Sequence, residues 1–167
     1  MSCWNIIECK GINSNGRMGL HFSSQGWVKD CCLFSKEGIE CNLIGQFATD
    51  SFSLLSVKMC NNIQLFFICL SQATNNIKEE LWEKIDILRD ESLHLIMIGD
   101  FNIDSRDFDV LTQHFIENNL VQLVKEPTHI EGRIIDHVWV SKMFPKFDLS
   151  HQYPYYTQHK SIIIRFE

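Results

Sequence analysis

A chain of 167 residues, 45% of them hydrophobic and 22% charged, is long enough to bury the core of one globular domain. The formal net charge of −6 argues against a protein that coats nucleic acid through bulk electrostatics, although it is compatible with a local basic groove. No apolar run approaches the length of a membrane span. We therefore expect a single domain over residues 1–167 and no membrane partner.

The seven cysteines form no C-x-x-C pair, and the adjacent Cys31 and Cys32 do not have the spacing of a zinc site. Small buried thiols in a reducing compartment explain this pattern best. Because we also expect no signal peptide, the chain is predicted to be intracellular, in the cytoplasm or the nucleus.

Short β-type runs separated by turns dominate the first half of the chain. Residues 63–70 form the strongest run, and a turn at Asn61 and Asn62 separates it from the run before. Other strands are predicted at residues 3–8, 17–22, 33–34, 39–43 and 53–59. Consecutive strands joined by turns predict an antiparallel meander.

Two helices are predicted in the second half. The first, capped by Asn75 or Asn76 and ending near Asp90, has an apolar stripe at helical spacing: Ile77, Leu81, Ile85 and Leu88. The second, capped by Asp107 and closed by Asn118 and Asn119, carries Phe108, Leu111 and Phe115. Helices and strands alternate too irregularly for a Rossmann fold, and no G-x-G-x-x-G or Walker sequence is present. A mixed pair of sheets with outer helices fits better.

The apolar run of residues 93–99 ends at Gly99, and polar side chains follow at alternate positions: Asp100, Asn102 and Asp104. A short apolar run closed by glycine predicts a strand that is buried on both faces. In extended geometry Asp100 and Asn102 would point the same way, and an anionic acceptor beside a neutral amide suits an oriented water molecule and a bound phosphate. An Asx-rich turn that caps the next helix is an equally good interpretation.

Two further polar residues lie at predicted strand ends. Asp136 interrupts the apolar strand of residues 134–140, where a carboxylate is costly unless it is paired. His159, just before the last strand at residues 161–166, is its natural partner. Alternatively, Asp136 pairs with Arg133, or His159 is a loop residue without a role. A histidine oriented by a buried carboxylate, near an Asp that positions water, is a hydrolytic arrangement.

Three blocks follow one another in a characteristic order and spacing: residues 98–102 (IGDFN), 135–138 (IDHV) and 157–162 (TQHKSI). In these blocks the chain resembles the last three signature motifs of the endonuclease/exonuclease/phosphatase superfamily, which includes DNase I-like nucleases. Residues 127–137, from Pro-Thr-His to Asp-His, look most like the nuclease domains of transposable elements of the non-LTR retroelement and Helitron types. The similarity runs from about residue 17 to residue 167.

The resemblance implies an α/β fold, the four-layer α/β/β/α sandwich, with the first strands and helix lacking. It also implies hydrolysis of nucleic acid, with DNA as the expected substrate, assisted by Mg²⁺ or alternatively Mn²⁺. The chain would then be a domain of a larger transposon-encoded polyprotein. Asp100 would orient or deprotonate the attacking water, and Asn102 would hold that water or a phosphate oxygen. His159, aligned by Asp136, would stabilise the charged pentavalent phosphate.

The chain also departs from the superfamily pattern. Gln158 stands where the superfamily places a metal-binding Asp, and a neutral amide contributes no charge to a Mg²⁺ site. Leu70 and Ser71 replace an aromatic-Arg pair, and Glu8 only loosely matches the early metal-binding Glu. Two functions therefore stay open: a Mg²⁺-dependent nuclease, or a catalytically inactive relative that binds nucleic acid or protein.

Overall fold

The computed structural model describes residues 27–28, 31–32, 41–59, 62–144, 147–152 and 158–166. The strands predicted at residues 3–8, 17–22 and 33–34, and Glu8 with them, lie outside the described residues. Strands β1 (Trp27–Val28) and β2 (Cys31–Cys32) pair with each other in antiparallel fashion.

A mixed sheet of six strands forms the centre of the molecule, in the order β3-β4-β5-β6-β8-β7. Its strands are β3 (Cys41–Ala48), β4 (Phe52–Met59), β5 (Ile63–Leu70), β6 (His94–Asp100), β7 (Leu120–Gln122) and β8 (Asp136–Ser141). Strands β3, β4 and β5 form the predicted antiparallel meander. Strand β6 then joins β5 in parallel, and β8 returns antiparallel to β6.

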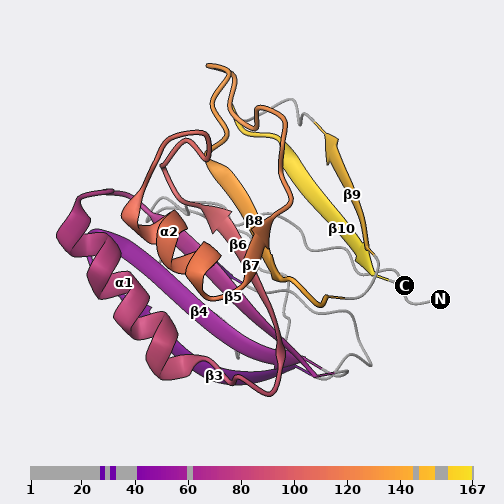
Figure 1. Cartoon of the computed structure of the whole chain (residues 1–167). Coiled ribbons are helices and arrows are strands. Elements are labelled where there is room, and N and C mark those ends of the chain that lie inside the picture. The colour runs from indigo at the N-terminus through magenta and orange to yellow at the C-terminus, as the bar shows by residue number, and fades with distance from the viewer. Residues whose placement is uncertain are drawn as a thin grey trace.

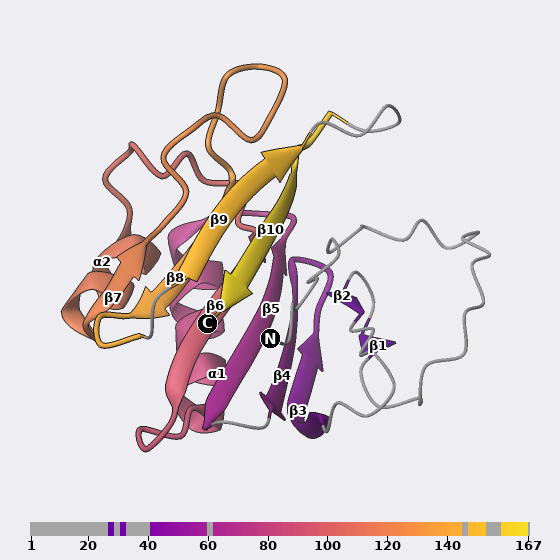
Figure 2. The ribbon, with the colours of Figure 1, turned by 90° about the vertical axis from the view of Figure 1, so that its right-hand side faces the viewer.

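Two layers cover this sheet on opposite faces (Figures 1 and 2). Helices α1 (Asn75–Leu88) and α2 (Val110–Glu117) lie over one face, and the antiparallel pair β9 (Phe147–Gln152) and β10 (Ser161–Phe166) lies over the other. The α/β class is confirmed, whereas a helical layer outside β9 and β10 stays a prediction. Neither described helix is long and apolar enough to cross a membrane.

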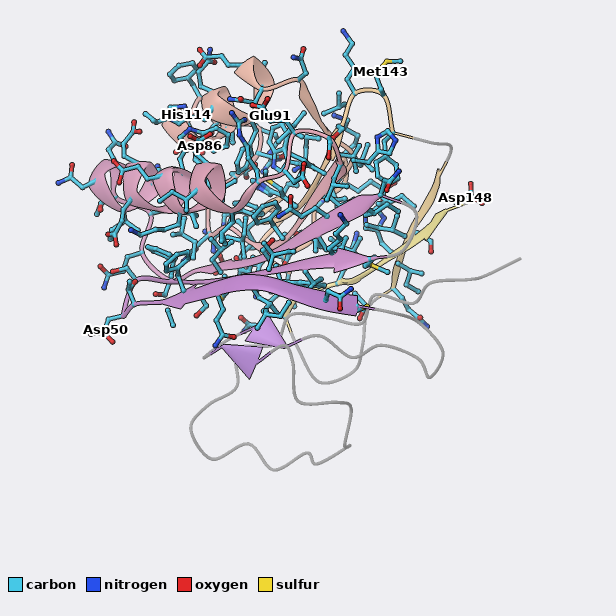
Figure 3. The ribbon with its side chains drawn as sticks, turned by 90° about the horizontal axis from the view of Figure 1, so that it is seen from below. Asp50, Asp86, Glu91, His114, Met143 and Asp148 are labelled. Atoms are coloured by element: carbon cyan, nitrogen blue, oxygen red, sulfur yellow. The ribbon has the colours of Figure 1, made fainter. Side chains whose placement is uncertain are left out.

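Alternate side chains of the central strands build two separate cores. On β6, Ile96 and Ile98 pack with Ile162 and Ile164 of β10, whereas Met97 packs on the helix side. Strand β6 is therefore buried on both faces, as its continuous apolar sequence predicts. Viewed from below, Asp50 and Asp148 lie at opposite edges of the molecule, outside these cores (Figure 3).

The start of α2 differs from the prediction. Its N-cap is Asp109, whose side chain accepts a hydrogen bond from Leu111 N at 2.9 Å, and not Asp107. Asp109 also forms a buried ion pair with Lys78 of α1, and this tertiary contact favours it as the cap. Phe108, predicted to lie in this helix, instead precedes it and is 89% exposed.

The start of α1 differs in the same way, because Thr74 takes the capping position in place of Asn75 or Asn76. Its side chain makes no capping hydrogen bond, so α1 depends on its packing rather than on its cap. The predicted apolar stripe is confirmed at Leu81 and Ile85, which are fully buried. Asn118 and Asn119 close α2 as predicted, and Asn119 has a positive φ of 59°.

Gly99 allows β5 and β6 to approach closely just before the polar residues of β6. Its φ is +151°, and a Cβ built at this position would lie 1.7 Å from the carbonyl oxygen of Ile68 on β5. Backbone atoms cannot give way as a flexible side chain can, so only glycine fits between these strands. Gly99 thereby permits the pairing of β5 and β6 to continue to Asp100.

Replacing Gly99 with alanine should lower the free energy of unfolding by about 3 kcal/mol or more, because the new Cβ overlaps a backbone carbonyl. Gly132→Ala is the matched control: Gly132 also has a positive φ, of 79°, but no atom lies within 4 Å of a Cβ built there. That variant should lose only about 1 kcal/mol, from backbone strain. Urea denaturation of both variants measures the difference, and equal losses would contradict the steric argument.

Candidate active site

Asp100, at the end of β6, and Asp136, at the start of β8, lie directly opposite each other in the antiparallel ladder. His159 lies just before β10 and reaches the same place from the second sheet. Ligand atoms of these three side chains all lie within 4.8 Å of one another. The structure thus brings together three of the four residues that the sequence singles out as catalytic.

His159 is paired with Asp136 and not left in the loop without a contact. Its Nδ1 lies 3.0 Å from Oδ2 and 3.1 Å from Oδ1 of that carboxylate. A carboxylate only accepts hydrogen bonds, so Nδ1 carries the proton and donates it. The alternative partner, Arg133, instead forms an ion pair with Glu131 at 2.9 Å.

Burial, with the charge of Asp136 as a second cause, raises the pKa of Asp100 to about 6. Burial is the main cause, because it disfavours the charged form, and the negative charge of Asp136 adds to it. The backbone hydrogen bond from Asn102 and positive charge on His159 or His129 act in the opposite direction. The result is a carboxyl group that titrates close to neutral pH.

Asn102 lies next to Asp100 in a turn, not on a continued strand. Its φ is +51°, and its backbone N–H donates to Asp100 Oδ1 at 2.9 Å. Its exposed side chain has Nδ2 3.5 Å from the carbonyl oxygen of Ser71. The two side chains therefore do not extend together from a strand. The alternative interpretation, an Asx turn, is the one present, although the cap of the next helix is Asp109.

Asp104, the third polar residue of this segment, belongs to a separate contact. It accepts a hydrogen bond from Nε of Arg106 at 2.8 Å, and this bond is the main cause that lowers its pKa to about 2. It does not belong to the group formed by Asp100, Asp136 and His159.

Thr128 fixes the relative position of Asp136 and His159. Its fully buried hydroxyl accepts from the backbone N–H groups of Ile135, at 3.2 Å, and Asp136, at 3.0 Å. Its carbonyl oxygen accepts from Lys160 N at 2.7 Å, next to His159. Sequence reasoning gave Thr128 and His129 no role, although both lie in the block that carries the resemblance to transposable-element nucleases.

His137 supports the site from inside the core. Its Nε2 donates to the carbonyl oxygens of Ile103, at 2.8 Å, and Ile134, at 3.0 Å, while Nδ1 accepts from the Trp139 indole at 3.3 Å. Burial lowers the pKa of His137, so the ring is held neutral. Since Ile103 follows β6 and Ile134 precedes β8, His137 joins the two segments that carry Asp100 and Asp136.

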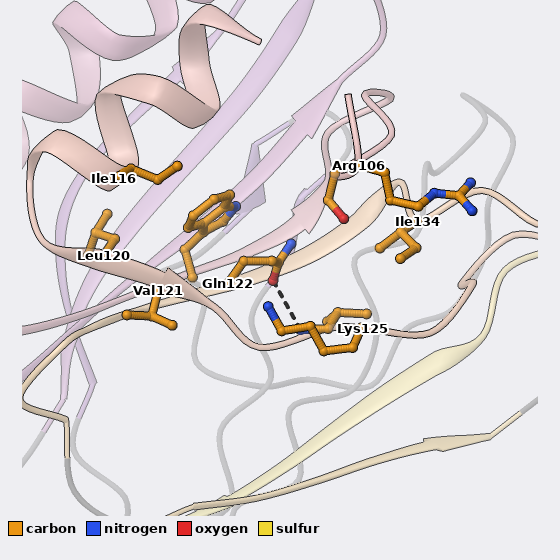
Figure 4. A pocket seen from close by; sticks show the side chains of 10 residues that line it. Arg106, Ile116, Leu120, Val121, Gln122, Lys125 and Ile134 are labelled. Carbon is orange, nitrogen blue, oxygen red and sulfur yellow. Dashed lines mark hydrogen bonds between the residues drawn. The ribbon is translucent and has the colours of Figure 1, made fainter. Parts of the chain in front are cut away.

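A cavity of about 440 Å³ lies apart from this cluster, between α2, β7 and the segment after β6 (Figure 4). Its walls include Ile116, Leu120, Gln122 and Trp139, and none of the three clustered side chains lines it. The Nε2 of Gln122 is buried there without a hydrogen-bond partner. Convergent ionisable groups, rather than cavity size, therefore identify the candidate active site.

Comparison with known proteins finds matches among solved structures. No known protein-family profile and no curated protein matches the chain. The endonuclease domain of TRAS1, a telomere-specific non-LTR retrotransposon, matches with 11% identity and a TM-score of 0.56, over 79% of this chain and 70% of that one. CdtB, the biologically active subunit of cytolethal distending toxin, matches with 15% identity and a TM-score of 0.52, over 77% and 57%.

An endonuclease/exonuclease/phosphatase family protein from Leptotrichia buccalis matches with 11% identity and a TM-score of 0.51, over 78% of this chain and 61% of that one. The chain thus spans 57% to 70% of the length of these three structures. At such low identities the likeness concerns the fold. The resemblance that the sequence indicates is confirmed at that level: this chain has the DNase I-like fold of endonuclease/exonuclease/phosphatase proteins.

Proposed function

We propose that the chain is a divalent-metal-dependent phosphodiesterase that acts as a nuclease, with DNA as its substrate. The proposal rests on the group formed by Asp100, Asp136 and His159, whose ligand atoms lie within 4.8 Å of one another. Phosphodiester hydrolysis needs a group that orients or deprotonates water and groups that stabilise charge on the phosphate. The likeness to the endonuclease domain of a non-LTR retrotransposon supports nucleic acid as the substrate class, and a place in a larger transposon-encoded polyprotein.

In this proposal Asp100 orients the attacking water and accepts a proton from it. With a pKa of about 6, its carboxylate is mostly ionised at neutral pH and still basic enough to accept a proton. The backbone N–H of Asn102 occupies Asp100 Oδ1, which leaves Oδ2 as the acceptor for water. The exposed Asn102 amide, in the turn beside it, would hold the water or a phosphate oxygen.

In the same proposal His159 binds the phosphate and stabilises its negative charge. Because Nδ1 is bound to Asp136, Nε2 is the ring atom that would meet a phosphate oxygen. The carboxylate favours the positively charged imidazolium, which is the form that stabilises added negative charge in the transition state. Asp136 therefore acts through His159, as a positioning residue.

The donor set fits a divalent cation such as Mg²⁺ or Mn²⁺. Asp100 and Asp136 are the described carboxylates that would hold it. A bound cation would offset the repulsion between them, which adds to the effect of burial on the pKa of Asp100. The cation would supply polarisation of the phosphoryl oxygens. Gln158 is exposed and neutral where the resemblance implies an Asp, so we expect weak affinity for Mg²⁺.

Nicking of supercoiled plasmid across a Mg²⁺ and Mn²⁺ series tests the function. Asp100→Asn and His159→Ala should each lower the rate by about 100-fold or more, since each residue acts in the transition state. Gln158→Asp should raise the rate mainly at low Mg²⁺, because it adds a charged ligand. Asp148→Asn, at an exposed position on β9, is the matched control and should nick like the wild type.

One result would reverse the proposal in favour of the inactive relative. If neither the wild type nor Gln158→Asp nicks DNA above the Asp100→Asn background, the protein is catalytically inactive although these residues are present. The same proteins would then be assayed for binding to nucleic acid.

Asp100 should also destabilise the fold at neutral pH. Its folded pKa of about 6 lies above the ordinary value of 3.8. The free energy of unfolding that the protonated group supports below pH 4 is therefore lost as the pH rises through 6. Asp100→Asn should therefore raise the free energy of unfolding at pH 8 by about 1–2 kcal/mol, and change it little at pH 4. Urea denaturation at both pH values measures this, and an equal effect at both would refute the shifted pKa.

The Asp136–His159 pair has a spectroscopic signature. Long-range ¹H–¹⁵N spectra at high pH should show the neutral ring of His159 protonated at Nδ1, because Asp136 accepts there. Asp136→Asn should lose this preference and lower nicking, while thermal denaturation shows that the fold persists. A ring protonated at Nε2 in the wild type would exclude the pair.

A further inference from the structure

His129 is held beside His159 by the backbone. The two residues form an isolated antiparallel bridge. Hydrogen bonds from Ile130 N to Gln158 O, at 2.9 Å, and from Lys160 N to Thr128 O, at 2.7 Å, hold the two segments together. The His129 side chain is only 8% exposed, so surrounding protein atoms fix its position.

The two imidazoles contact each other. Their ring centroids lie 4.9 Å apart, with the ring planes inclined at 73°. Both rings are near enough to Asp100 for positive charge on either to lower the pKa of its carboxyl. His129 thus lies at the candidate active site, although it is not one of the three residues whose ligand atoms gather there.

The hydrogen bonding of His129 leaves one ring atom unused. Nδ1 accepts from the backbone N–H of Glu131 at 3.2 Å, so the neutral ring carries its proton on Nε2. Among the described residues no group accepts from that Nε2, and it is not one of the fully buried atoms that lack a partner. A buried histidine normally satisfies both nitrogens, so an accessible N–H at this place is ready for a ligand.

We propose that His129 is a second imidazole donor for the phosphate, its Nε2–H bonding a phosphoryl oxygen beside the one bound by His159. The proposal rests on the proposed function, since it concerns the same site. It differs from the role of His159, because the hydrogen bond at His129 Nδ1 comes from the backbone N–H of Glu131, and the Glu131 carboxylate lies farther away, at 3.6 Å. Two donors on adjoining segments would share the negative charge of the phosphate, where Gln158 brings no charge to help bind a metal ion.

Binding of inorganic phosphate tests the proposal without any need for turnover. Titration of the whole chain with phosphate, followed in ¹H–¹⁵N imidazole spectra, should shift the Nε2 resonance of His129 together with that of His159. His129→Phe keeps a ring against His159 but has no donor, and should weaken phosphate binding by about 10-fold. His129→Gln places an amide N–H near the position of Nε2 and should restore most of the affinity.

His94→Phe is the matched control, because His94 is half-buried at the opposite end of β6 and its ring contacts Phe144. It should bind phosphate like the wild type, and circular dichroism should show the same thermal transition for all variants. If phosphate leaves the His129 resonances unmoved, or if His129→Phe binds as well as the wild type, the proposal is wrong.

Plasmid nicking separates this proposal from the proposed function. In an active protein, His129→Phe should lower kcat/KM by about 10- to 100-fold, and His129→Gln should recover most of that loss. Full activity of His129→Phe would overturn the role of His129 and leave the nuclease assignment intact. A wild type that binds phosphate through His129 but nicks nothing would overturn the nuclease assignment alone.

Discussion

The site depends on the register between β6 and β8, which places Asp100 opposite Asp136. Like charges at facing positions of a ladder repel each other, so this pairing is unfavourable by itself. The structure compensates on one side only: Asp136 has His159 as its partner, whereas Asp100 keeps a raised pKa. One carboxylate is thus hydrogen-bonded to a histidine, whereas the other has a raised pKa.

The neighbouring residues hold that register in place. His137 donates to carbonyl oxygens of the segment after β6 and of the segment before β8. Thr128 accepts hydrogen bonds from the backbone just before β8 and from the backbone just before β10. Gly99 removes the side chain that would otherwise push β6 away from β5. These features all belong to the backbone or the core. They therefore hold the polar side chains at the end of β6 in fixed positions.

Strong local patterns predicted much of the fold. The apolar runs of β4, β5 and β6, the stripe of α1 and the block from Asp136 to His159 are all readable from residue type and spacing. The cap of α2 could not be predicted, because Asp107 and Asp109 are equivalent as caps in sequence and only the buried contact with Lys78 distinguishes them. Tertiary contacts of this kind have no local sequence signal.

The geometry of the site was predicted less completely. Extended spacing placed Asp100 and Asn102 on one face, but the turn between them depends on a positive φ that Asn tolerates and the alternation rule ignores. His129 and Thr128 escaped notice because a histidine and a threonine in a loop carry no periodicity. Their importance arises from the bridge to residues 158–160, a contact between segments about thirty positions apart in the sequence.

The docking of the small β9–β10 sheet onto the central one has a consequence for the timing of site assembly. His159 enters with β10, whereas Asp100 and Asp136 belong to the central sheet, so the site is complete only when the two sheets are in contact. The described core residues of β10 are Ile162 and Ile164. Local opening of this pair of strands would dismantle the site while α1, α2 and the six-stranded sheet stayed folded. The site therefore depends on contact between the two sheets, and amide hydrogen exchange along β10 reports how often that contact opens.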